Sequence, residues 1–455
     1  MRTEKITTKS FNMAFDKLNQ SQKNAVQTLD GPVLVQAGPG TGKTEVLALR
    51  VGQILSETDM QAENILCLTF SRAGVASMKK RLGELIGSDA EKVTVETFHS
   101  FADKVLRQIT TTDKHKKNLL TKSRRYMILE KLLRDPNIGG IYCDGKLTSG
   151  ARLSSIARIF DLLKKEGINA TKLRELTKHC IEDILPNHPD YRGIRVPLNE
   201  KGRKISNELI FFRDTIAPIF ETYHAILAKH NLCDYEDLLI ESINKLKSDK
   251  DLLLNFQIRY QYILVDEFQD TNALQYAWLK LLSGHDVSRV NVSGMGSSSV
   301  FAVGDDDQSI YAFRGADVEN MRLYEKQYQP MMVKLEQNYR SHGHILDSAN
   351  HLIANNSERL GKNLRTDAGH GEPVRIYEAP SDHAEAAWLV DEIKALVSSG
   401  IQRTEIALLY RSNAQSRIIE HALFSAGIPY RVYGGLRFFE RAEIKHALAY
   451  LRLLE

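Results

Sequence analysis

The chain has 455 residues, with 61 lysines and arginines against 57 aspartates and glutamates, for a formal net charge of +4. This length predicts two to three domains, and so balanced a charge does not by itself indicate a nucleic-acid partner. No apolar run approaches the roughly 20 residues of a membrane helix, and the polar N-terminus has no signal-peptide core. The four scattered cysteines form no CxxC pair, which argues against a zinc site or a disulfide scaffold. We therefore expect a cytoplasmic protein.

The first hundred residues alternate short apolar runs with helical patterns. Bounded apolar runs predict buried strands, and apolar residues at helical spacing predict helices. The predicted strands are 32–37, 63–70 and 92–98, and the predicted helices are 42–55, 72–86 and 99–109. Strands separated by helices indicate an α/β fold with a parallel sheet.

The middle of the chain, from about residue 104 to 230, has no strand signal. Residues 103–135 hold ten lysines and arginines against four acidic residues. Apolar residues recur at helical spacing, so we predict a mostly helical insertion. Its basic stretch fits either a solvated helical face or a DNA-binding surface.

Strand signals return after the insertion. The predicted strands are 262–265, 300–303, 332–336, 374–378, 405–410 and 430–433, and the predicted helices are 382–398 and 413–426. The first sheet should be completed after the insertion, and a second α/β domain should follow it. The Ser/Gly-rich residues 292–299 are expected to form a flexible loop.

A glycine-rich loop between the first predicted strand and helix has the pattern of a phosphate site. A triphosphate needs inward-pointing backbone N–H groups, which such a loop presents at a helix N-terminus. Lys43 would bridge the β- and γ-phosphates, and the Thr44 hydroxyl would bind Mg²⁺. The residues of this predicted ATP site are Ala37 (where the strict pattern has glycine), Gly38, Pro39, Gly40, Thr41, Gly42, Lys43 and Thr44.

The run ILVDE at 263–267 is an apolar strand that ends in two carboxylates. Asp266 could hold Mg²⁺ through its water shell, and Glu267 could orient and deprotonate the attacking water. An ordinary strand end is the alternative, but the glycine-rich loop in the same chain favours the catalytic interpretation.

These residues belong to a set of strings that resembles the UvrD/Rep family of superfamily 1 DNA helicases. The strings occur in the family's order: LNQSQKNAV at 18–26, AGPGTGKT at 37–44, LTFSRAG at 68–74, ETFHSFA at 96–102, ILVDEFQDTN at 263–272, VGDDDQSIYAFRGA at 303–316, LEQNYRS at 335–341 and YGGLRFFERAEIKHALAYLRL at 433–453. The resemblance implies a P-loop NTPase fold of RecA-like parallel sheets. Residues 1–103 and 235–335 would form the first, ATP-binding motor domain, 104–234 a DNA-contacting helical insertion, and 336–455 an incomplete second motor domain.

The resemblance also implies roles for single residues. Gln22 matches a glutamine that contacts the adenine edge, and Tyr339 matches an aromatic residue that stacks on the base. Gln308 matches a residue that links the γ-phosphate to the DNA groove. Arg340 matches an arginine that reaches the γ-phosphate, where its planar fork suits the developing charge. Outside the family context, ordinary surface or hydrogen-bonding roles are the alternative.

A track for single-stranded DNA is implied as well, built from hydroxyls, cations and aromatic faces. Its candidate residues are Thr69, Phe70, Thr97, Phe98, His99, Tyr311, Phe313 and Arg314. Phe313 is the best candidate for stacking on a base, because the family usually has tryptophan there. An aromatic residue at a strand end is otherwise more often part of the core, and His99 could equally cap a helix.

Three departures from the family pattern affect these expectations. Glu45 stands where relatives have an arginine that packs against the base, and residues 71–74 (SRAG) differ from the family's usual sequence. The family's last two motifs, with a further arginine for the γ-phosphate, would lie beyond Glu455.

The resemblance implies an ATP- and Mg²⁺-dependent DNA helicase that moves 3′ to 5′ on single-stranded DNA and opens ss/ds junctions in repair or replication. Repair or replication proteins are possible partners, and no membrane is involved. The alternative is an ATP- and DNA-binding module without motor activity. A RecB-like helicase–nuclease fits poorly, since no nuclease carboxylate cluster is evident.

Overall fold

The computed structural model describes residues 8–109, 117–135, 150–191, 198–285, 298–357, 359–433 and 450. The chain divides into two compact units, Met1–Glu372 and Pro373–Glu455, which are described separately below. Among the described residues, no helix combines the length and the apolar character needed to cross a membrane.

The first unit is built on a six-stranded parallel sheet in the order β3-β2-β6-β7-β1-β8. Its strands are β1 (Val33–Ala37), β2 (Ile65–Thr69), β3 (Thr94–Thr97), β6 (Tyr262–Val265), β7 (Ser299–Gly304) and β8 (Met331–Leu335). The predicted parallel α/β sheet is confirmed, and it is completed after the insertion. The strand predicted at 332–336 is β8, which pairs with β1.

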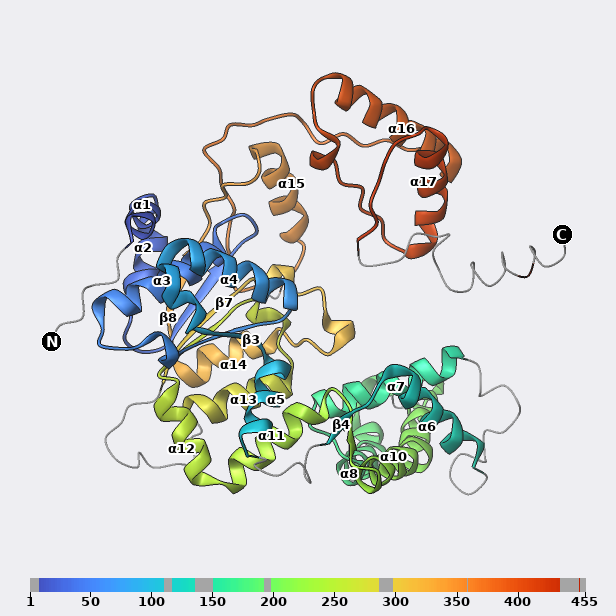
Figure 1. Ribbon diagram of the computed structural model, residues 1–455. Coiled ribbons are helices and arrows are strands. Elements are labelled where there is room, and N and C mark those ends of the chain that lie inside the picture. Colours follow the sequence, from blue (N-terminus) through green and yellow to red (C-terminus); the bar gives the residue numbers. More distant parts are fainter. Residues whose placement is uncertain are drawn as a thin grey trace. The chain divides into compact units, whose positions relative to one another are not determined.

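Helices cover both faces of this sheet (Figure 1). One core holds Val33 and Val35 of β1, and the opposite core holds Leu34, because side chains alternate along a strand. The helices on the first face are α1 (Lys9–Asp16), α2 (Gln20–Gln27), α3 (Lys43–Glu57) and α4 (Arg72–Ile86). Those on the second face are α5 (Phe98–Ile109), α11 (Asp237–Ser248), α12 (Lys250–Arg259), α13 (Ala273–Ser283) and α14 (Glu319–Tyr328).

The insertion is helical, as predicted, with its own core around Phe160, Phe220 and Tyr223. Its helices are α6 (Lys122–Arg134), α7 (Gly150–Lys165), α8 (Ala170–His179), α9 (Glu200–Phe211) and α10 (Ala217–Lys229). A two-residue parallel ladder joins β4 (Asn118–Leu119) to β5 (Leu232–Cys233). These strands are too short to give a sequence pattern, and they are compatible with the prediction of a mostly helical insertion.

After β8 the chain forms α15 (Gly343–Ile353) and returns along the first unit. The return segment, residues 359–372, forms a backbone bridge between Gln337 and Arg365. Its Leu364 covers the glycine-rich loop, where a Cβ on Gly38 would lie 2.3 Å from the Leu364 Cδ2 atom. The segment is therefore part of the first unit.

The second unit contains α16 (Asp382–Ser398) and α17 (Asn413–Ser425), which pack through Val390, Ile393 and Leu423. The strands predicted at 374–378, 405–410 and 430–433 were wrong, because none of these described segments joins a ladder. Residues 374–378 are exposed, whereas 406–410 and 428–433 alternate between half-buried and exposed positions. The alternation reports which side chains face the helices, but a strand also requires a hydrogen-bonded neighbour.

Candidate nucleotide and DNA site

The glycine-rich loop follows β1 and leads directly into the 15-residue helix α3. Gly40 and Gly42 have φ angles of 69° and 87°, in the left-handed region that favours glycine. A Cβ on Gly40 would also lie 2.7 Å from the Arg340 Cβ and from the Asn338 Nδ2. Inside the loop, the buried Thr41 hydroxyl donates to the Gly38 carbonyl over 2.8 Å. The loop thus places backbone N–H groups at the start of α3, where an anion is favoured.

The two carboxylates after β6 lie beside this loop. Lys43 Nζ is 3.4 Å from Glu267 Oε2, so the predicted phosphate-binding lysine and the predicted base are paired. Glu267 has a positive φ of 50°, a strained conformation for a residue with a side chain. Such strain is found preferentially at functional sites.

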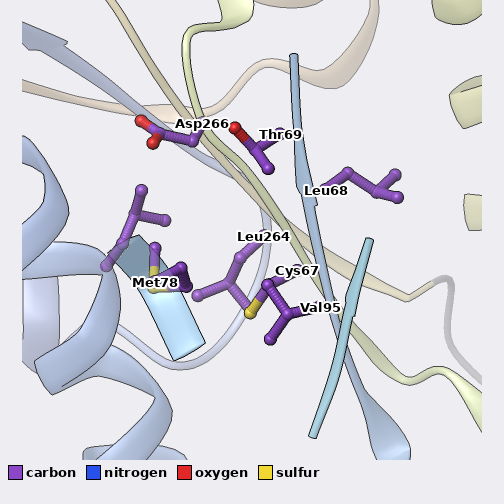
Figure 2. Close-up of a pocket in the computed structure, with 8 residues that line it drawn as sticks. Cys67, Leu68, Thr69, Met78, Val95, Leu264 and Asp266 are labelled. Carbon is purple, nitrogen blue, oxygen red and sulfur yellow. The ribbon is translucent and has the colours of Figure 1, made fainter. Parts of the chain in front are cut away.

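Asp266 directly follows β6 and is half-buried. Burial, followed by the charge of Glu267, raises the pKa of Asp266 to about 6, although Lys43 opposes the shift. Figure 2 shows its carboxylate and the Thr69 hydroxyl above an apolar layer that includes Leu264 and Cys67. These four side chains help to line a cavity of about 10 Å³. An apolar floor beneath a carboxylate favours either protonation or a bound cation.

A relay of amides connects Glu267 to the end of β7. Gln269 donates from Nε2 to Glu267 Oε2 over 2.8 Å, and its Oε1 accepts the backbone N–H of Asp305 over 2.9 Å. Gln308 in turn donates from Nε2 to Asp305 Oδ2. The two strand ends are therefore linked through buried or half-buried polar groups.

Asp305 is the centre of a second, larger network. Lys362, whose side chain is 2% exposed, contacts the carboxylates of Asp305, Asp306 and Asp307. Burial alone would lower the pKa of Lys362, but the three carboxylates raise it. Arg359 pairs with Asp307 through two contacts of 2.7 Å. The return segment is thus tied to the site by charge as well as by Leu364.

Residues 338–340 are held against the glycine-rich loop. Asn338 donates from Nδ2 to the Pro39 carbonyl over 2.7 Å, and its Oδ1 accepts the backbone N–H of Arg340 over 2.8 Å. The backbone N–H of Tyr339 donates to Gly40 over 2.9 Å. The side chains of Tyr339 and Arg340 remain exposed, with Tyr339 at 58%.

Gln22 is buried, and both of its amide atoms have partners. Its Nε2 donates to the Thr41 carbonyl over 2.9 Å, and its Oε1 accepts the backbone N–H of Asn19 over 3.0 Å in the capping box of α2. Asn19 also donates to the Tyr339 hydroxyl over 2.9 Å. The adenine contact predicted for Gln22 would require an exchange of these partners.

Glu45, where relatives have arginine, pairs with Arg81 of α4. Two contacts of 2.6 Å join their side chains. A guanidinium group therefore does lie beside position 45, although it comes from another helix.

Several predicted DNA-contacting residues form an aromatic row. The rings of Phe70 and Tyr311 stack with centroids 5.6 Å apart, and those of Tyr311 and Phe313 are 6.0 Å apart. The Arg314 guanidinium lies over both Tyr311 and Phe313, at 4.6 and 5.4 Å. Phe313 is 57% exposed, so its face is open to a stacking partner.

The other predicted DNA contacts are less accessible. Phe98 is 2% exposed and packs edge-on against Trp278 in the core, so we do not retain it as a contact residue. Phe98 directly follows β3, and its side chain packs among the helices that cover the second face of the sheet. Thr69 and Thr97 are buried, and His99 lies 3.1 Å from Glu236 and stacks on Tyr235.

Comparison with protein families agrees with this arrangement. Residues 18–329 match the UvrD/REP helicase N-terminal domain, and residues 333–455 match the UvrD-like helicase C-terminal domain. The chain belongs to the UvrD/REP helicase family. This confirms the predicted resemblance and the P-loop NTPase fold.

Named relatives of this UvrD/REP chain are DNA helicases. DNA helicase II of Escherichia coli K12 is 36% identical over 440 residues, which cover 96% of this chain and 54% of the relative. ATP-dependent DNA helicase PcrA of Staphylococcus epidermidis is 34% identical over 444 residues, which cover 97% of this chain and 54% of the relative. The chain therefore spans about half the length of these relatives.

Residues outside the UvrD/REP strings also build the site. The strings quoted above contain Asp305 to Asp307 but neither Arg359 nor Lys362, whose partners lie about 50 residues earlier. Lys165 of the insertion donates to the Arg314 carbonyl over 2.7 Å, beside the aromatic row. No local sequence signal identifies Lys165 or Lys362, because the contacts of each depend on a partner that is distant in sequence. Most of the string at 433–453 lies outside the described residues, as does most of the loop at 292–299.

Proposed function

We propose that this chain is an ATP-dependent DNA helicase that moves 3′ to 5′ along single-stranded DNA and opens ss/ds junctions. The observation that carries the proposal is the relay from Lys43 through Glu267, Gln269 and Asp305 to Gln308. It joins a phosphate loop to the segment that bears the aromatic row. The relatives named DNA helicase II and ATP-dependent DNA helicase PcrA support the same activity.

The nucleotide would enter with its phosphates on the N–H groups at the start of α3. In the structure Lys43 is paired with Glu267 at 3.4 Å. A bound β,γ-phosphate would draw Lys43 away, and the freed Glu267 carboxylate could then orient the attacking water. Gln22 and Tyr339 would contact the base, and Arg340 would reach the γ-phosphate. The side chains of Tyr339 and Arg340 are exposed, so both can reach a bound nucleotide.

Thr44 and Asp266 would hold Mg²⁺ beside the phosphates. A hydroxyl and a carboxylate are the oxygen ligands that Mg²⁺ prefers, usually with several waters retained. Asp266 fits this role, because its carboxylate is desolvated directly after β6 and a bound cation would favour its charged form. Bound Mg²⁺ would neutralise charge that develops on the phosphates.

DNA would stack its bases on Phe313, Tyr311 and Phe70, with Arg314 close to the backbone. Thr69 and Thr97 are the last residues of β2 and β3, His99 lies in the first turn of α5, and all three would border this track. Gln308 lies three residues before Tyr311. A shift of Gln308 on loss of the γ-phosphate would therefore be passed to the aromatic row. We place this activity in DNA repair or replication in the cytoplasm, with the proteins of those pathways as partners.

Strand separation tests the proposal directly. A fluorescent duplex with a 3′ single-stranded tail should open in the presence of Mg²⁺ and ATP, whereas the same duplex with a 5′ tail should not. A non-hydrolysable ATP analogue is the control. If the chain binds ATP and DNA but opens neither duplex, the helicase proposal fails and the binding-module alternative stands.

A further inference from the structure

Two histidines and an aspartate converge at the beginning of α15. His344 and Asp347 lie three residues apart near its start, which places them on one face of the helix. His370 comes from the return segment. One ligand atom from each residue lies within 4.8 Å of the other two. We propose that these three side chains bind a late first-row divalent metal ion. Zn²⁺ is the ion used in the test below.

The backbone already holds the two segments together. The N–H of Gly343 donates to the Gly369 carbonyl over 2.8 Å, and the N–H of His344 donates to the His370 carbonyl over 2.9 Å. His342 adds a contact of 2.9 Å from Nδ1 to the Ala368 carbonyl. The ligands would therefore meet without a new backbone arrangement, which reduces the entropy cost of binding.

The turn that carries His370 is shaped by its two neighbours. Gly369 and Gly371 have φ angles of 78° and 68°, which favour glycine. A Cβ on Gly371 would also lie 2.4 Å from the Cβ of His342. The sequence Gly-His-Gly thus presents the imidazole ring to α15, with ring centroids of His344 and His370 5.4 Å apart.

The donor set selects the class of metal. Two imidazole nitrogens and one carboxylate oxygen suit Zn²⁺, Co²⁺ or Ni²⁺, whereas Mg²⁺ prefers oxygen ligands alone. With bonds of about 2.0–2.1 Å, donors around a tetrahedral ion lie roughly 3.3 Å apart. Asp347 and His370 are exposed and His344 is half-buried, so side-chain rotation can close the remaining gap. Three protein ligands would leave a coordination position for water or another ligand.

A bound ion would cross-link α15 to the end of the first compact unit. His370 precedes the unit boundary at Glu372 by two residues. Because binding to the folded state alone raises stability, the ion should also raise the unfolding temperature. This site goes beyond the proposed helicase activity and does not depend on it.

Zn²⁺ titration of the nucleotide-free chain by calorimetry tests the proposal. We expect one equivalent to bind, with no competition from millimolar Mg²⁺. His370→Ala and His344→Ala should each weaken binding at least about tenfold. His351→Ala is the matched control, because His351 is exposed two turns further along α15. It should leave the affinity and the Zn²⁺-dependent rise in unfolding temperature unchanged.

Equal Zn²⁺ affinity in the wild-type chain and in His370→Ala would overturn the proposal, as would binding of Mg²⁺ with the same affinity. The milder variant Asp347→Asn provides a second measurement if an alanine variant fails to fold. It removes the charge of one ligand and should weaken binding, and unchanged affinity there would also count against the site.

Discussion

Replacing Lys362 with methionine should destabilise the first compact unit by about 3–5 kcal/mol, the usual cost of removing one partner from a buried ion pair. Lys362 and Asp305 are 2% and 0% exposed at their side chains, so water cannot replace the missing charge. Asp306 and Asp307 would lose the same partner. The methionine retains most of the apolar stem, which isolates the effect of the charge.

Urea unfolding followed by tryptophan fluorescence measures this loss. Trp278 is fully buried in the first unit, whereas Trp388 belongs to the second, so a Trp388→Phe background makes the signal specific. Lys245→Met is the matched control, because its 3.2 Å contact with Asp249 is exposed and should contribute about 0–1 kcal/mol.

A second substitution separates charge from packing. Adding Asp305→Asn to Lys362→Met should recover part of the lost stability, because a neutral amide no longer leaves the buried charge unpaired. A loss below about 1 kcal/mol for Lys362→Met alone would refute the reasoning, since the network would then contribute no more than a surface pair.

Three further predictions concern stacking, catalysis and pH. Phe313→Ala should weaken single-stranded DNA binding by about 1–3 kcal/mol, measured by fluorescence anisotropy. Phe424→Ala is the control, because Phe424 is exposed in the second unit, and it should leave the affinity unchanged. Equal affinities of the wild-type chain and Phe313→Ala would contradict the stacking role. Glu267→Gln should reduce ATP hydrolysis by about 10²–10⁴-fold with ATP affinity retained, and undiminished turnover would exclude Glu267 as the base. Burial lowers the pKa of His224 to about 4, so folding stability should fall as pH drops from about 6.5 towards 4. His224→Gln should flatten this dependence and His230→Gln should not, and a slope that survives in His224→Gln would count against the assignment.

The first sheet was largely predictable because its strands are buried on both faces. Such strands appear as short continuous apolar runs, and the runs at 32–37 and 262–265 led to β1 and β6. Their order in space was not predictable, because β6 joins β2 only after a long insertion. The glycine-rich loop was recognisable for a local reason, since its function depends on consecutive residues.

The errors have equally specific causes. In the second unit, the pattern at 405–410 gave the correct half-buried side chains, Ile406 and Leu408, but no ladder forms there. Phe98 follows a strand like a track residue, yet it points into the core. Lys362 was missed because a lysine in sequence gives no sign of burial until its three carboxylate partners surround it.

ATP hydrolysis by this 455-residue chain, with and without single-stranded DNA, tests the central claim most directly. Lys43→Ala is the control, because Lys43 is the residue paired with Glu267 in the phosphate site. The helicase account predicts turnover that DNA stimulates and that Lys43→Ala abolishes. Hydrolysis that is indifferent to DNA, or that survives in Lys43→Ala, would contradict it.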